Sequence, residues 1–200
     1  MAKLIMVRHG ESDGNRERRF TSTPAAPLTD LGRAQAREAA ETIKKGRFAP
    51  RRIITSPYSR AHETGRIIAS VLELPVEIEE GIYEREFGYL RGMSYDAIHQ
   101  DPSYNSADLW TWKPEGGESF EDLRRRIAPI IDKLAARSDA EGELMVVSHG
   151  GVMLAAWAHV TGSWEGAQVP PNCGIILIER AAGDYKAPTV VAGAPTVAPF

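Results

Sequence analysis

The sequence predicts an α/β fold of three layers, in which helices cover both faces of a mostly parallel sheet. Short, continuous apolar runs alternate along the chain with longer segments whose apolar residues recur at helical spacing. Such alternation is typical of strands joined by right-handed helical crossovers. The composition, 42% hydrophobic and 26% charged over 200 residues, is that of a compact domain with a sizeable core. We therefore expect a single domain over residues 1–200.

The first strand–helix unit occupies the N-terminal part of the chain. Leu4–Val7 is a continuous apolar run, too short for a helix and typical of a strand that is buried on both faces. After a polar stretch, Leu31–Lys45 predicts a helix, with Thr29 as its N-cap and Gly46 at its C-terminus. We therefore expect a strand, a loop and a helix in that order.

A second unit follows directly. Arg52–Thr55 predicts a strand, with Ser56 as the N-cap and Pro57 as the first residue of the next helix. Apolar residues at helical spacing continue to Leu72, and Pro75–Ile78 predicts a third strand.

The middle of the chain, residues 81–117, is less regular. It carries several aromatic residues among glycines and prolines, and it predicts an insertion that lies over the active site. Two of its aromatics, Trp110 and Trp112, either line a hydrophobic substrate pocket or pack the insertion onto the domain, and the sequence leaves both alternatives open.

The last part of the chain returns to alternation. Ser119, followed three residues later by Asp122, predicts the start of a helix, in which Pro129 should produce a kink. The further expected elements are a strand at Leu144–Val147, an apolar helix at Val152–Val160 and a last regular strand at Ile175–Ile178, near an exposed sheet edge.

Polar residues follow three of the predicted strands at the points where the strands end. Ligands of such sheets bind beyond the carboxyl ends of the strands, so we expect these side chains to lie together. They are Arg8, His9 and Gly10 after the first strand, Ser56 and Arg60 after the second, and Ser148, His149, Gly150 and Gly151 after the strand at 144–147.

Two histidines and two arginines at one sheet edge are suited to a phosphoryl group. A guanidinium can donate hydrogen bonds to two phosphate oxygens at once, and the free N–H groups where Gly150 and Gly151 open a helix also attract anions. One imidazole can attack phosphorus while the other stabilises the oxygens. An alkoxide leaving group needs a proton donor, for which Glu84 is the best candidate, with Glu80 and Glu86 nearby in the sequence.

A series of motifs in fixed order resembles the phosphoglycerate mutase-like branch of the histidine phosphatase superfamily. A lone RHG would be a weak signal, whereas the whole series is specific and spans most of the chain. The motifs are RHGES at Arg8–Ser12, PLTxxGRxQA at Pro27–Ala36, SPYSRAxET at Ser56–Thr64, ExxFGxLxG at Glu84–Gly92, GGES at Gly116–Ser119 and SHGG at Ser148–Gly151.

This resemblance implies a role for each matching residue. His9 is implied to be the phosphorylated nucleophile, and Glu84 the acid and base. Arg8, Arg60 and His149 are implied to hold the phosphoryl group. The resemblance implies no metal, and we expect no cofactor. The expected substrate contacts are Ser12, Asn15, Thr21 and Gly150.

Three functions are compatible with these motifs. The first is a metal-independent phosphatase that hydrolyses small phosphomonoesters, and the second is a cofactor-primed phosphoglycerate mutase. The mutases resemble this chain at Arg19–Thr21, but they typically continue with a glycine, where Ser22 stands, and they carry a paired-arginine stretch. Between Gly92 and Glu118 the sole lysine or arginine is Lys113, which favours the phosphatase, of the broad-specificity type. An inactive phospho-ligand binding module ranks third, because His9, His149 and the acid are all present.

Charge and cysteine content restrict the partners. A formal net charge of −3 argues against a general nucleic-acid or membrane-surface binder, and no apolar run approaches a membrane span. The single cysteine, Cys173, cannot form an internal disulfide. We therefore expect a cytoplasmic enzyme whose partner is a small phosphorylated metabolite. The sequence leaves the oligomeric state open, and a homodimer could form where Ile175–Ile178 lies near an exposed sheet edge.

The remaining polar candidates have simpler interpretations. His62, His99 and His159 are expected to be structural, and Arg124–Arg126 is expected to be a solvated helix face. Asp13, Arg18 and Arg19 lie near the nucleophile, and the sequence does not decide whether they contact substrate.

Overall fold

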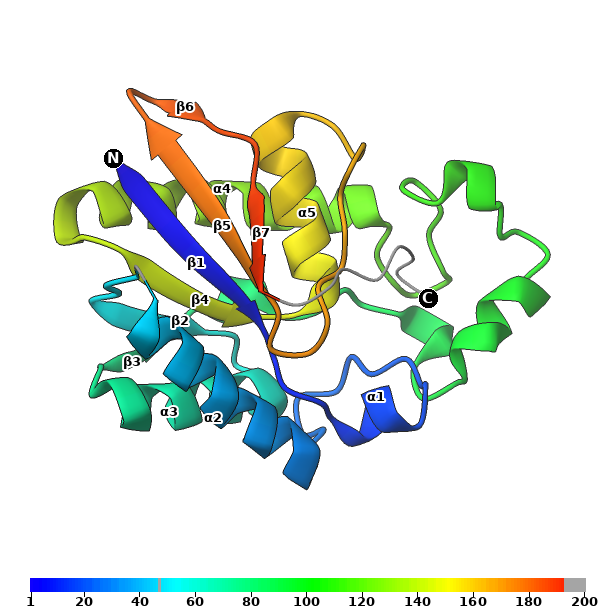
Figure 1. Ribbon diagram of the computed structural model, residues 1–200. Helices are drawn as coiled ribbons and strands as arrows, with labels where there is room; N and C mark the ends of the chain where they lie inside the picture. The colour runs from blue at the N-terminus through cyan, green and yellow to red at the C-terminus, as the bar shows by residue number, and fades with distance from the viewer. Residues whose placement is uncertain (47, 193–200) are drawn as a thin grey trace.

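The computed structural model describes residues 1–46 and 48–192, so the last eight positions of the expected domain lie outside it, as does residue 47. Its centre is one sheet (Figure 1). In order across the sheet, the strands are β3 (Val76–Ile78), β2 (Arg52–Thr55), β4 (Leu144–Ser148), β1 (Ala2–Arg8), β5 (Ile175–Ala181) and β6 (Asp184–Tyr185), with β7 (Thr189–Ala192) also paired to β5.

The strands that carry the site are parallel. β1 pairs with β4, β4 with β2, and β2 with β3, all in parallel, whereas β5, β6 and β7 extend one side in antiparallel pairs. The expected mostly parallel α/β fold is confirmed. The prediction that Ile175–Ile178 is the last strand and lies near an exposed edge is wrong, because β7 pairs with residues 175–177 on the side opposite β1. That segment therefore does not offer the open edge expected for a homodimer.

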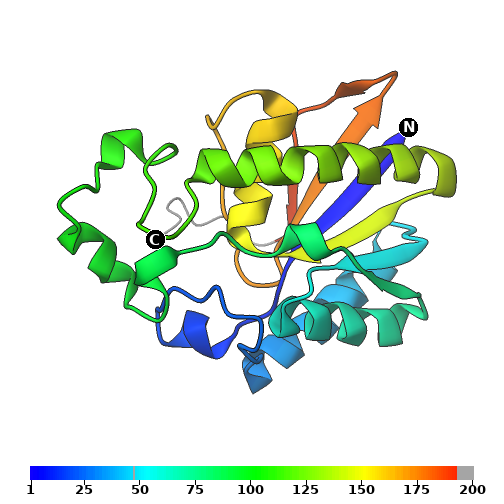
Figure 2. The ribbon, with the colours of Figure 1, turned by 180° about the vertical axis from the view of Figure 1, so that it is seen from behind.

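Helices cover both faces of this sheet (Figures 1 and 2). Along β1, Ile5 and Val7 face a core shared with α2 (Asp30–Lys45) and α3 (Ser59–Leu72). Leu4 and Met6 point to the opposite face, against α4 (Phe120–Glu141) and α5 (Gly150–Thr161). Burial of β1 on both faces explains its continuous apolar run. No helix in the described part of the chain has both the length and the apolar character needed to cross a bilayer.

The helix starts test the predicted caps. Thr29 caps α2 through its hydroxyl, and Ser119 forms a capping box with Asp122 at the start of α4, as predicted. The prediction for Ser56 is wrong, since α3 begins at Ser59 after Tyr58. The Ser56 hydroxyl lies instead 2.7 Å from Nε2 of His149.

Helix α4 continues through Pro129 from Phe120 to Glu141. Proline removes one N–H donor from the helix and therefore leaves one carbonyl without its usual partner. Pro129 lies on the exposed face, where water can satisfy that carbonyl, so the helix is not interrupted.

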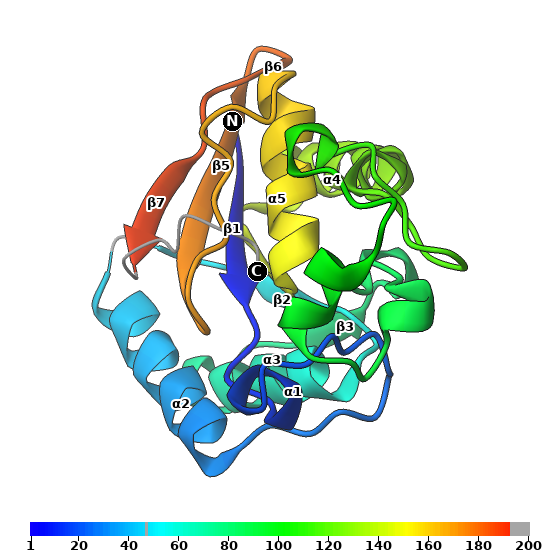
Figure 3. The same ribbon diagram turned by 90° about the vertical axis from the view of Figure 1, so that its right-hand side faces the viewer.

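The segment 81–117 forms a cap beyond the carboxyl end of β1 (Figure 3). It is tied to the short helix α1 (Asp13–Arg16) and the loop after it, because Phe20 N donates to Met93 O and Tyr95 N donates to Arg18 O, both at 2.9 Å. The 3₁₀ helices in and next to this segment are Glu80–Ile82, Gly88–Leu90, Tyr95–Gln100 and Ser106–Asp108. Its apolar centre contains Phe20, Phe87, Leu90, Ile98 and Trp112.

Both tryptophans of the cap serve packing. Trp112 is buried in the cap itself and donates through Nε1 to Ser103 Oγ at 3.2 Å. Trp110 stacks on Trp164, with ring centroids 4.5 Å apart and planes at 7°. Neither is among the residues that line the cavity beneath the cap, so packing is the alternative that the structure supports.

Candidate active site

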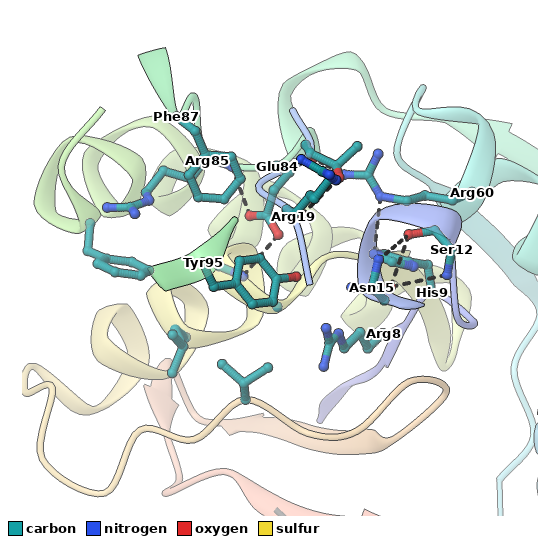
Figure 4. Close-up of a pocket in the computed structure, with 16 residues that line it drawn as sticks. Arg8, His9, Ser12, Asn15, Arg19, Arg60, Glu84, Arg85, Phe87 and Tyr95 are labelled. Atoms are coloured by element: carbon teal, nitrogen blue, oxygen red, sulfur yellow. Dashed lines mark hydrogen bonds between the residues drawn. The ribbon is translucent and has the colours of Figure 1, made fainter. Parts of the chain in front are cut away.

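The three predicted strand ends meet at one cavity (Figure 4). The backbone itself joins them, because His9 N donates to Ser148 O at 2.9 Å and Ser56 N donates to Val147 O at 3.0 Å. The predicted site residues that line the cavity are Arg8, His9, Ser12, Asn15, Thr21, Arg60, Glu84 and Gly150. His149, the remaining one, is not among the lining residues. It is fully buried next to His9, with the two ring centroids 5.2 Å apart.

The His9 side chain is buried, and its Nε2 is the unprotonated nitrogen of the ring. Nδ1 lies 2.7 Å from the carbonyl oxygen of Gly10, and a carbonyl can only accept, so we assign the proton to Nδ1. Nε2 accepts from Arg60 Nε at 3.2 Å. Burial, together with the charges of Arg60 and Arg8, lowers the pKa of His9 well below 6.5. The imidazole is therefore neutral near pH 7, as a nucleophile must be.

Two segments far away in the sequence fix the His9 backbone. Asn172 donates through Nδ2 to His9 O at 3.0 Å and to Asn15 Oδ1 at 3.1 Å, and Cys173 N also donates to His9 O. Gly10 lies so close to Gly32 that a Cβ would collide with the Gly32 carbonyl. The sequence analysis missed Asn172, because it stands in a turn outside every recognised motif.

The two arginines are held by loop carbonyls and face the cavity. Arg60 is 2% exposed, and its terminal nitrogens donate to Thr21 O at 2.9 Å and Thr23 O at 3.2 Å. Burial lowers the pKa of Arg60 to about 10, so it keeps its charge at neutral pH. Arg8 donates through Nη1 to Pro170 O at 2.9 Å, while its buried Nε has no partner among the described residues. Two fixed cations and one unused donor suit an anionic ligand.

The His149 ring is oriented by Ser56. Burial is the main reason that the pKa of His149 lies well below 6.5, so the ring is neutral. The Ser56 hydroxyl, 2.7 Å from Nε2, accepts from Tyr58 N at 3.3 Å and can donate to Nε2. We therefore assign the His149 proton to Nδ1, which is buried and has no partner among the described residues. A ligand oxygen would supply the missing acceptor.

Replacement of Ser56 tests this tautomer. We expect Ser56→Ala to weaken the binding of inorganic phosphate by about tenfold, or about 1.4 kcal/mol, because His149 could then place its proton on either nitrogen. Calorimetric titration with phosphate measures the effect. Ser70→Ala removes an exposed hydroxyl from α3, the helix that follows Ser56, and should bind phosphate like the unaltered protein. Equal affinities for the two variants would contradict the assigned tautomer.

Glu84 faces the cavity from the cap side. Its Oε1 accepts from Arg85 N at 2.8 Å and its Oε2 from Gly151 N at 3.3 Å. A Cβ at position 151 would collide with the Glu84 carboxyl, so this contact requires glycine. Glu86 points elsewhere, to Tyr58 and Arg91, and only Glu84 of the nearby glutamates lines the cavity. The Glu84 carboxyl is therefore placed where it could donate a proton to a leaving group in the cavity.

The predicted substrate contacts largely shape the loop after His9. Ser12 caps α1, donating to Asn15 Oδ1 at 3.0 Å, and the same oxygen accepts from Asn172. The carbonyl of Thr21 accepts from Arg60. Ser12, Asn15 and Thr21 line the cavity, so the loop both borders the cavity and positions the Arg60 guanidinium.

The cavity also has an apolar wall that the sequence analysis did not identify. Its members come from four separate segments, and only their shared apolar character at the sheet edge could have indicated them. Arg19 and the buried Arg85 border the cavity as well, with the Arg85 guanidinium 4.1 Å from the Phe120 ring centroid; Asp13 and Arg18 do not. The wall is formed by Phe87, Tyr95, Phe120, Leu154 and Val169.

The described residues contain no group of three or more histidine, cysteine, aspartate or glutamate side chains placed to hold a metal ion. The ligating groups of the cavity are guanidinium, imidazole and backbone N–H donors, which match an anion.

The chain is similar to known proteins of two activities. The chain is 34% identical over 165 residues to a 2,3-bisphosphoglycerate-dependent phosphoglycerate mutase of Gloeobacter violaceus, covering 78% of this chain and 74% of that one. It is 32% identical over 165 residues to a glucosyl-3-phosphoglycerate phosphatase of Mycobacterium tuberculosis, covering 76% and 72%.

A solved structure and a family model complete the comparison. The fold superposes on a mycobacterial glucosyl-3-phosphoglycerate phosphatase in complex with VO3, with a TM-score of 0.85 and 26% identity, covering 97% of this chain and 100% of that one. The model of the histidine phosphatase superfamily (branch 1) matches residues 4–191. The chain belongs to branch 1 of the histidine phosphatase superfamily.

Proposed function

We propose that the protein hydrolyses small phosphomonoesters through a phosphohistidine at Nε2 of His9. One observation carries this proposal. A neutral, buried imidazole presents its Nε2 lone pair beside the Arg60 guanidinium, and the Glu84 carboxyl borders the same cavity. That arrangement supplies a nucleophile, a phosphate-binding cation and a proton donor.

The first chemical step transfers the phosphoryl group to the enzyme. The Nε2 lone pair of His9 attacks phosphorus, the bond from phosphorus to the ester oxygen breaks, and the departing alkoxide takes a proton from Glu84. Arg8, Arg60 and the Nδ1–H group of His149 stabilise the charge on the phosphoryl oxygens.

The second step returns the enzyme to its starting state. The Glu84 carboxylate, left without its proton, takes one from a water molecule, and the resulting hydroxide attacks phosphorus. The bond between phosphorus and His9 Nε2 breaks, and its electron pair returns to the nitrogen. The net reaction consumes one water and releases an alcohol and inorganic phosphate.

Hydrolysis is preferred over mutase activity because the segment between Gly92 and Glu118 lacks the paired-arginine stretch of the mutases. Lys113, the lysine that the sequence offers as a carboxylate ligand, pairs with Asp122 at 3.1 Å and does not line the cavity. Ser22, where mutases typically have glycine, is buried and accepts from Arg91 Nε at 3.0 Å. We infer that the apolar wall of the cavity accepts the less polar part of an ester.

We also infer that the partner is a small phosphorylated metabolite and that the reaction needs no metal or cofactor. The inferred setting is cytoplasmic, since Cys173 has no cysteine to pair with.

A parallel assay with and without chelator tests this function. We expect phosphate release from a panel of alkyl, aryl and sugar phosphates to be unchanged by EDTA, because arginines and not a metal bind the phosphoryl group. The same preparation is assayed for conversion of 3-phosphoglycerate to 2-phosphoglycerate after priming with 2,3-bisphosphoglycerate. Fast isomerisation with little release would make the protein a mutase, and neither activity would indicate a binding module.

A further inference from the structure

Arg126 is partly buried against the segment that carries Glu84, although the sequence predicts a solvated face at Arg124–Arg126. Its side chain is 17% exposed, against 69% for Arg125 on the same helix, α4. The prediction of a solvated face is therefore wrong for Arg126. The spacing of the three arginines turns one of them toward the cap, and Figure 2 shows the segment around residues 80–90 running alongside the first half of α4.

The Arg126 guanidinium binds the backbone on the N-terminal side of the acid. Nη1 donates to Gly81 O at 2.7 Å and to Tyr83 O at 3.2 Å, and Nη2 donates to Glu84 O at 3.5 Å. The guanidinium carbon also lies 3.7 Å from the centroid of the Tyr83 ring. One planar group thus contacts three carbonyls of a short stretch while it also binds Glu118, an arrangement that suits the five fixed donors of a guanidinium.

Glu118 completes the arrangement on the other side of the acid. It accepts from Arg126 through both oxygens, Nε to Oε1 and Nη2 to Oε2, each at 2.8 Å. Its Oε2 also accepts from Glu86 N at 3.1 Å, while Glu118 N donates to Glu86 O at 2.8 Å. The pair of Arg126 and Glu118 therefore fixes the backbone both before and after Glu84.

Other side chains also pack against this stretch, with Arg85 on Phe120 and Tyr83 on Tyr58, whereas Arg126 and Glu118 bind its backbone. Residues 83–86 belong to no helix or strand. The Glu84 carboxyl itself is oriented by the adjacent N–H of Arg85 and by Gly151 N, and neither of these contacts holds the chain trace on the α4 side. A displacement of the backbone by about 1 Å would move the carboxyl out of reach of an ester oxygen, and misplacement of that size can cost about 100-fold in rate.

We infer that Arg126, held by Glu118, is a positioning residue: it fixes the position of the Glu84 carboxyl relative to the leaving-group oxygen. The inference rests on the proposed function, since it assigns Glu84 the task of protonating the alkoxide. Neither Arg126 nor Glu118 lines the cavity, so both act through Glu84 and not on the substrate.

The dependence on leaving group distinguishes this role from a general structural one. A misplaced acid slows esters with poor leaving groups and spares p-nitrophenyl phosphate, whose leaving group hardly needs a proton. Loss of general structure would slow both. The quantity to compare is kcat/KM, because it reports phosphoryl transfer to the enzyme and excludes the later hydrolysis step that all substrates share.

The experiment compares Arg126→Ala with Arg125→Ala, which removes an equal charge from the exposed side of α4. We expect Arg126→Ala to lower kcat/KM for glycerol 2-phosphate by about tenfold or more and for p-nitrophenyl phosphate by less than about twofold. Arg126→Lys should fall between Arg126→Ala and the unaltered protein, since an ammonium cannot span Glu118 and the carbonyls together. Arg125→Ala should match the unaltered protein on both substrates.

A double variant completes the test. In a Glu84→Gln background, Arg126→Ala should cause no further loss on glycerol 2-phosphate, because two residues that act as a unit are not additive. Glu118→Gln gives a second route should Arg126→Ala unfold, as judged by thermal melting, and it should show the same selective loss on the poor leaving group. Equal loss on both substrates, or full additivity with Glu84→Gln, would overturn the inference. Absence of phosphate release by the unaltered protein would instead refute the proposed function.

Discussion

His9→Ala is expected to abolish the phosphoenzyme and to lower kcat by at least about 10⁴-fold. Loss of Nε2 removes the one lone pair that the cavity places beside Arg60, so no group remains to take the phosphoryl group from the ester. Brief incubation with radiolabelled substrate, followed by alkaline quenching, measures the acid-labile phosphate that phosphohistidine retains.

The fold should survive this change. The side chain makes one hydrogen bond to its neighbour Gly10 and one with Arg60, and it stands at a strand end outside the main apolar cores. His99→Ala, an exposed histidine in the cap, is the matched control and should retain labelling and turnover. Acid-labile phosphate on the His9 variant would show that another histidine is the nucleophile.

Glu84→Gln is expected to have the second largest effect, a loss of about 10²–10⁴-fold in kcat/KM for substrates with poor leaving groups. Glutamine keeps the volume and can still accept from Arg85 N and Gly151 N, but it has no proton to give to an alkoxide. For p-nitrophenyl phosphate we expect kcat/KM to change by only about twofold. Steady-state assays with glycerol 2-phosphate and p-nitrophenyl phosphate measure both values.

A neighbouring glutamate provides the control. Glu80→Gln, in the same segment but exposed, should leave both substrates unaffected. An equal loss on the two substrates after Glu84→Gln would point to a different acid, and retention of activity on both would remove Glu84 from the mechanism.

Features set by local chemistry were the ones that the sequence predicted well. Strands buried on both faces need continuous apolar runs, so the ends of β1 and β4 could be located, and with them Arg8, His9 and His149. The caps at Thr29 and Ser119 depend on residues within one helical turn. Topology then brought these ends together, because parallel strands place their carboxyl termini at one edge.

Features that depend on distant partners were missed or misassigned. Ser56 has a side chain suited to capping, yet its hydroxyl is within hydrogen-bond distance of His149, which follows β4. Arg126 looks like its neighbours in the sequence, and only the docking of the cap distinguishes it. Likewise, the four residues of β7 are too few for their pattern alone to predict a strand, and the strand depends on its pairing with β5.

The position of β1 in the sheet has a consequence for how the protein is made. β1 is synthesised before the other described strands, yet its two neighbours in the sheet, β4 and β5, follow β2 and β3 in the sequence. Asn172, which fixes the His9 carbonyl, is 163 positions away from it. Pairings over such long stretches of chain form slowly and late. The nucleophile is therefore synthesised before the strands that flank β1 and is set in place only after them, so that a nascent chain stays inactive until β5 has emerged.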